Sequence, residues 1–72
     1  MFRVQFRDAA NRNTVIAKTM YLPFDPRDQK EVRIRQRGKD EKHIGYRVVD
    51  HHYEIVIDDP GESGVVVYLT RM

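Results

Sequence analysis

The side chains best suited to chemistry lie close together in residues 48–57, which read VVDHHYEIVI. Asp50, His51, His52 and Glu54 combine carboxylate and imidazole groups, which bind several divalent metal ions and also serve in general acid–base catalysis. All four stand inside a run of apolar residues. Whether they form one site therefore depends on the secondary structure that positions them.

A strand would place the two adjacent histidines on opposite faces, because successive side chains alternate along a strand. The expected core face carries Arg47, Val49, His51, Tyr53, Ile55 and Ile57, and the expected outer face carries Val48, Asp50, His52, Glu54, Val56 and Asp58. His51 is then a polar residue at the edge of the core, bonded to a neighbour.

The outer row of Asp50, His52 and Glu54 has about 7 Å between neighbours, from a rise of about 3.3 Å per residue. Two adjacent members reach one ion, whereas three in a row span too far without a bulge. We therefore expect a solvated row in which the two carboxylates flank His52. The alternative is a weak metal site made by His52 with Asp50 or Glu54.

Other catalytic arrangements have less support. The single serine, Ser63, lies in the stretch GESG, which is one residue short of a G-x-S-x-G elbow and leads into a strand. The chain has no cysteine, so it has no thiol nucleophile and no disulfide. Its four glycines match no phosphate-binding loop. We expect a protein that is not an enzyme, with no catalytic residue, cofactor or metal.

Apolar periodicity predicts five short strands, at residues 2–7, 14–22, 31–37, 45–57 and 65–71. The fourth is long and is expected to bend or bulge. Asp25 before Pro26 resembles a helix N-cap and predicts at most one short helical turn near residues 25–30. Pro60 and Gly61 suit the centre of a type II turn, and the short link that contains them favours an antiparallel hairpin of the last two strands.

These elements predict an all-β fold in one small domain, residues 1–72: an antiparallel five-stranded barrel or curled sheet of SH3-like or OB-like size. Arg3 and Arg7 interrupt the apolar N-terminus, so we expect no signal peptide. No run approaches the roughly 20 apolar residues that cross a bilayer. A cytoplasmic protein without a membrane partner is expected.

The basic residues supply the main functional signal. Residues 1–42 hold eleven Lys/Arg and six Asp/Glu, a net +5, whereas residues 43–72 hold two and five, a net −3. If the first and third strands share a sheet, their outward side chains join into one positive patch, extended by the following turn. The predicted patch comprises Arg3, Arg7, Arg33, Arg35, Arg37, Lys39 and Lys42. Such a patch binds nucleic-acid backbone or an acidic protein surface.

A second hypothesis is protein interaction or regulation, including self-association. Residues 20–24, MYLPF, hold more large apolar groups than one strand face buries. Tyr21 and Phe24 become interface anchors if both are exposed. The apolar segment 65–69 is a candidate for edge-to-edge pairing with a second copy. The sequence does not choose between nucleic acid and protein.

Overall fold

In the computed structural model, residues 1–38 and 42–72 are described, apart from the side chains of Lys18 and Gln36. This part of the chain forms β1 (Phe2–Asp8), β2 (Val15–Leu22), β3 (Glu31–Gln36), β4 (Lys42–Glu54) and β5 (Gly64–Arg71), with two 3₁₀ turns, η1 (Pro26–Asp28) and η2 (Pro60–Glu62). The predicted all-β class is confirmed, and every predicted strand overlaps an observed one. No helix among the described residues is long and apolar enough to span a membrane.

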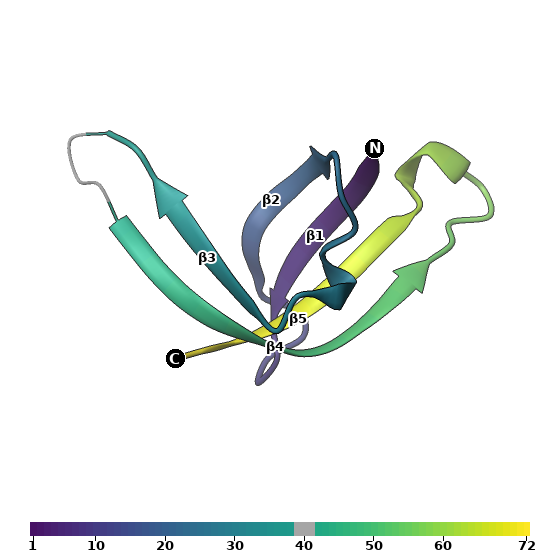
Figure 1. The fold of residues 1–72 in the computed structure, drawn as a ribbon. Coiled ribbons are helices and arrows are strands. Elements are labelled where there is room, and N and C mark those ends of the chain that lie inside the picture. Colours follow the sequence, from purple (N-terminus) through teal and green to yellow (C-terminus); the bar gives the residue numbers. More distant parts are fainter. Residues whose placement is uncertain (39–41) are drawn as a thin grey trace.

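The strands form one curled sheet in the order β2-β1-β5-β4-β3, which makes a half-barrel (Figure 1). Three pairings are antiparallel, including the predicted β4–β5 hairpin, but β1 and β5 pair in parallel. The prediction of a purely antiparallel sheet is therefore wrong. The chain reverses direction at each successive strand, so the fifth strand runs the same way as the first when the curled sheet brings them together.

The core lies on the inner face of the half-barrel. Val4 and Phe6 of β1 and Val65, Val67 and Leu69 of β5 are buried there, and apolar residues of the other three strands pack around them. Val66 and Tyr68, on the outer face of β5, are buried as well. This burial reflects the central place of β5 between β1 and β4. The segment Val65–Leu69 therefore cannot pair edge to edge with a second copy, because both of its edges are already paired.

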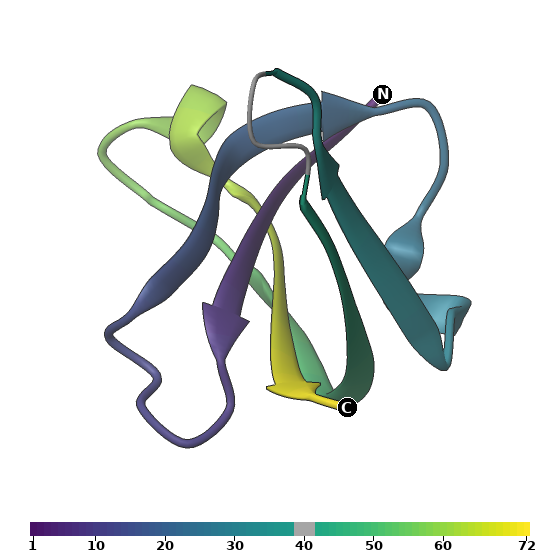
Figure 2. The same ribbon diagram turned by 90° about the vertical axis from the view of Figure 1, so that its left-hand side faces the viewer.

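The long strand β4 bends and pairs with two other strands. Its first half pairs with β3 and its second half with β5. A register shift lies between Val48 and Asp50, so Val49 bulges out of the ladder. Such a bulge reverses the alternation of side chains. Figure 2 shows the curl of the sheet from the side.

The bulge overturns the predicted core face of β4 in the first half of the strand and leaves it unchanged after Asp50. Before it, Tyr46 and Val48 pack on the core, whereas Arg47 is exposed. After it, His51 and Tyr53 stand opposite Val67 and Val65 and thus share the inner face, yet both are exposed. The predicted core residues Val49, Ile55 and Ile57 are also exposed, the last two by 74% and 87%.

The two 3₁₀ turns differ in how well the sequence predicted them. Asp25 caps η1 by accepting a hydrogen bond from the Arg27 backbone N–H, 3.0 Å away, which confirms the expected short turn. Pro60 and Gly61 form η2 and not a type II turn. A type II turn needs a positive φ at its second central residue, and among the described residues only Gly38 has one.

Candidate functional site

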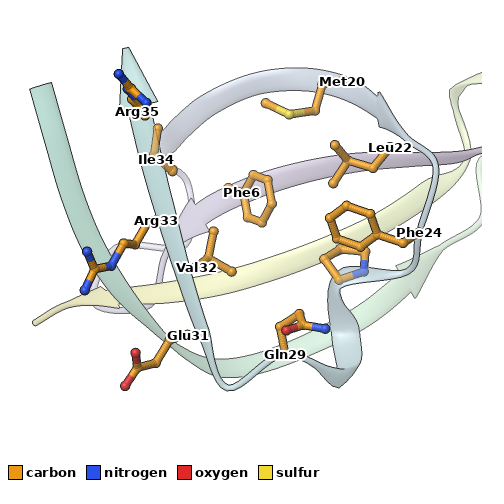
Figure 3. A pocket seen from close by; sticks show the side chains of 11 residues that line it. Phe6, Met20, Leu22, Phe24, Gln29, Glu31, Val32, Arg33, Ile34 and Arg35 are labelled. Carbon is orange, nitrogen blue, oxygen red and sulfur yellow. The ribbon is translucent and has the colours of Figure 1, made fainter. Parts of the chain in front are cut away.

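A groove separates β2 from β3, the two strands at the ends of the sheet order. Figure 3 shows apolar side chains pointing into it from both sides, with Phe6 as its floor. Its volume is about 620 Å³, within the range of about 300–1,000 Å³ that is usual for ligand pockets. Its apolar lining comprises Phe6, Met20, Leu22, Phe24, Pro26, Val32 and Ile34. The half-barrel thus exposes part of its core at this seam.

The connection between β2 and β3 forms one end of the groove. Pro26 is fully buried, and η1 packs against β5, so the turn is anchored to the core. The Arg27 guanidinium donates hydrogen bonds to both carboxylate oxygens of Asp25: Nε lies 3.0 Å from Oδ1 and 2.8 Å from Oδ2, and Nη2 lies 2.5 Å from Oδ2. These bonds, with the Arg27 backbone N–H, hold the pKa of Asp25 below its ordinary value. The loop that carries Phe24 is therefore held by both packing and charge.

Two predicted anchors lie on opposite faces of the sheet. Tyr21 is 62% exposed and stands opposite Arg3 on the outer face, whereas Phe24 is 52% exposed and lines the groove. Met20 and Leu22, from the same apolar run, pack against the core. Phe24 and Tyr21 therefore cannot contact the same small partner surface.

The arginine rows of β1 and β3 are separated. Both strands belong to one sheet, as expected, but β5 and β4 lie between them. With about 4.8 Å between neighbouring strands, the two rows are roughly 14 Å apart along the curled sheet. The single continuous patch predicted from the sequence is therefore not formed.

The arginines of β1 are engaged with neighbouring groups. Arg3 donates one hydrogen bond to the backbone carbonyl of Glu62 and another, of 2.7 Å, to its carboxylate. The Arg7 Nε donates to the Gln5 side-chain oxygen at 2.6 Å. These bonds tie β1 to η2 and to its own outer face, which favours a structural role for both arginines.

A smaller basic face remains on β3 and the first half of β4. Arg33 and Arg35 are exposed on the outer face, and Arg47 joins them from the neighbouring strand, opposite Glu31. Arg37 and Lys42 are exposed beside the turn between these strands, whereas Lys39 lies outside the described residues. Arg47 was missed because the predicted alternation placed it toward the core. Only the bulge at Val49 reveals its true face.

The histidines and carboxylates of residues 50–54 are positioned by the pairing of β4 with β5 and by hydrogen bonds to Asp50. The register places His51 and His52 on opposite faces, as predicted, and aligns the row of Asp50, His52 and Glu54 outward. Arg12 donates to Asp50 at 3.2 Å, and the His51 N–H donates to the same carboxylate at 2.8 Å. The His51 N–H, first, and Arg12 together hold the pKa of Asp50 below its ordinary value.

Arg12 and His52 also cover the Tyr68 ring on the outer face of β5. The Arg12 guanidinium lies 4.1 Å above the centroid of the Tyr68 ring, and the His52 ring lies 5.4 Å from it. Cation–π contact and burial of the ring stabilise this face. Within the described part of the chain, no group of three or more His, Asp or Glu side chains is placed to hold a metal ion. Arg12 carries no sequence signal for this contact, because it lies in a predicted turn 56 positions before Tyr68.

Comparison of the chain with models of protein families, with curated proteins and with solved structures found no significant match. The groove and the basic face of β3 and β4 are therefore judged by their own geometry.

Proposed function

We propose that this protein is a small binding module without enzymatic activity, and that the groove between β2 and β3 accepts apolar side chains of a partner protein. The observation that carries the proposal is a groove of about 620 Å³ at an unclosed seam, with an apolar lining in which Phe24 is exposed and four further side chains are only partly buried: Met20, Leu22, Val32 and Ile34. A small domain gains little by leaving core-lining residues accessible, because burial of apolar surface is the main stabilising term in folding. A partner that fills the groove would complete the burial.

Phe24 is the residue best placed to anchor such a partner. Its side chain lines the groove and remains 52% exposed, while the turn that follows it is fixed by the buried Pro26. Aromatic residues held on rigid supports dominate the free energy of many interfaces, and their removal commonly costs about 2 kcal/mol or more. Truncation of Phe24 is therefore expected to weaken partner binding by roughly 30-fold.

Affinity capture from a lysate of the cells that make the protein tests this proposal. The immobilised wild-type protein and Tyr21→Ala should retain the same protein, and Phe24→Ala should lose it. Tyr21→Ala is a matched control, because Tyr21 is an equally exposed aromatic residue on the outer face. The complex should resist nuclease and high salt. Equal retention by both variants, or retention by none of the three proteins, would contradict the proposal.

Binding of nucleic-acid backbone is a second candidate function, favoured by the exposed arginines of β3 and by Arg47 beside them. It would make the captured material sensitive to nuclease and to salt, because phosphate contacts release counterions. Each arginine that contacts phosphate adds about 0.9 to the slope of log affinity against log salt. Arg47→Ala should then reduce that slope by about 1, whereas Phe24→Ala should leave it unchanged.

A further inference from the structure

β3 forms one wall of the groove, and its backbone is regular along its whole length. β3 pairs with β4 over consecutive residues without a register shift, from Glu31 opposite Arg47 to Gln36 opposite Lys42. The sheet order of the described residues gives β3 no second neighbour. Its far edge therefore presents backbone N–H and C=O groups that can pair with another strand.

β2, which forms the opposite wall of the groove, is less suited to pair with an added strand. β2 also lies at an end of the sheet order, but its ladder with β1 has register shifts between Val4 and Phe6 and between Phe6 and Arg7. Bulges bend a strand and increase its twist, which interferes with the addition of another strand. A strand entering the groove would thus pair with β3.

The side chains of β3 define which sequence such a strand would have. Val32 and Ile34 point into the groove, whereas Arg33 and Glu31, which also border it, direct their side chains away from Val32 and Ile34, toward the other face of the strand (Figure 3). A strand added at this edge would follow the same alternation, with side chains at opposed positions on the same face. Its inward residues would meet Val32 and Ile34, and its outward residues would stand beside Arg33 and Arg35. Apolar residues fit the first positions and carboxylates the second.

We infer that the β3 edge and the groove bind an extended segment of a partner protein, in which acidic residues alternate with apolar ones, as an added strand of the sheet. The inference rests on the proposed function, because it specifies the segment that the groove accepts. A second copy of this chain could satisfy the charges only in part. Antiparallel pairing of two β3 strands with Arg33 opposite Arg35 would bring like charges together, which destabilises a sheet, and pairing with Glu31 opposite Arg33 would leave Arg35 outside the matched positions.

A charge-exchange experiment tests the recognition by arginine. Two labelled peptides of about eight residues, a common strand length, alternate Val and Ile with either Glu or Lys, and their binding is followed by fluorescence anisotropy. The wild-type protein should bind the Glu peptide more tightly than the Lys peptide. The double variant Arg33→Glu, Arg35→Glu should lose roughly tenfold to hundredfold in affinity for the Glu peptide, because two cross-strand attractions become repulsions. It should gain affinity for the Lys peptide.

Arg47→Glu is the matched control, since Arg47 lies on the same outer face but one strand away from the β3 edge. It should reduce the affinity for the Glu peptide far less than the double variant does. Far-ultraviolet circular dichroism of each variant verifies that the fold is retained. Arg47→Glu changes the net charge by half as much as the double variant does, so a loss of binding free energy half as large or larger in Arg47→Glu would show that only the overall charge matters, and would overturn pairing at the β3 edge.

Backbone pairing has its own test. N-methylation of the Glu peptide at alternate residues, in two sets, blocks the amide groups on one edge of the bound strand at a time. One set should abolish binding, because its amides face β3, and the other should leave it nearly unchanged. Binding that survives both sets, or no binding of the unmodified Glu peptide, would overturn the inference. If Phe24→Ala still abolishes capture of a partner protein, the proposed function stands without strand addition; if capture also fails, both are refuted.

Discussion

Gly64→Ala tests the close approach of β1 and β5 at the start of their parallel pairing. A Cβ atom at position 64 would lie 2.4 Å from the Arg3 carbonyl oxygen and 3.0 Å from the Arg3 Cβ. Real Cβ atoms essentially never come within 3.0 Å of another heavy atom in this way. The backbones must therefore separate by at least about 0.6 Å at this point. Because the obstacle is a main-chain oxygen in a sheet, no side-chain rotation can relieve it.

Overpacking of this kind typically costs about 1–3 kcal/mol. For a domain of this size, each 1 kcal/mol lowers the melting temperature by about 4–8 °C, so we expect a decrease of roughly 5–20 °C. The measurement is thermal unfolding monitored by circular dichroism. Gly61→Ala is the matched control, because a Cβ there would meet only the Asp59 carboxylate at 3.6 Å, an ordinary contact. If Gly64→Ala proves as stable as Gly61→Ala, the close β1–β5 packing is refuted.

Two further predictions concern stability. Leu69→Ala removes a fully buried side chain, and we expect the free energy of unfolding in urea to fall by about 2–5 kcal/mol. Thr70→Ala, at the neighbouring exposed position, should change it little. Similar effects of the two substitutions would contradict the burial of Leu69 in the core. The depressed pKa values of Asp25 and Asp50 stabilise the protein above their unfolded values of about 4, and this stability is lost as the pH falls through the lower folded values. Urea unfolding between pH 6 and pH 2 should therefore show declining stability, and a smaller decline in Asp25→Asn; an identical decline in both proteins would contradict the Asp25–Arg27 pairing.

The positions of the strands were predictable because their apolar periodicity is strong. In β1 and β3, apolar side chains alternate with polar ones along the whole strand, and both strands lie close to their expected limits. In β4, the alternation reads smoothly from Arg47 to Ile57, yet the bulge at Val49 shifts it by one residue. A bulge depends on the register with neighbouring strands, which local periodicity does not encode.

The candidate site was predictable only in its separate parts. Met20, Leu22 and Phe24 stood out as an excess of apolar groups, and Val32 and Ile34 as the inward residues of a strand. Their meeting across one groove follows from the position of β2 and β3 at the two ends of the sheet order. Strand order is a tertiary property, and it is also the reason why the arginines of β1 and β3 do not combine.

Photo-crosslinking at the groove tests the central claim most directly. A photoreactive phenylalanine analogue is incorporated at position 24, which lines the groove, or at position 21, which lies on the outer face. After irradiation in the cells that make the protein, we expect one defined protein adduct from position 24 and none from position 21. Equal labelling at both positions, or adducts from position 21 alone, would contradict partner binding in the groove.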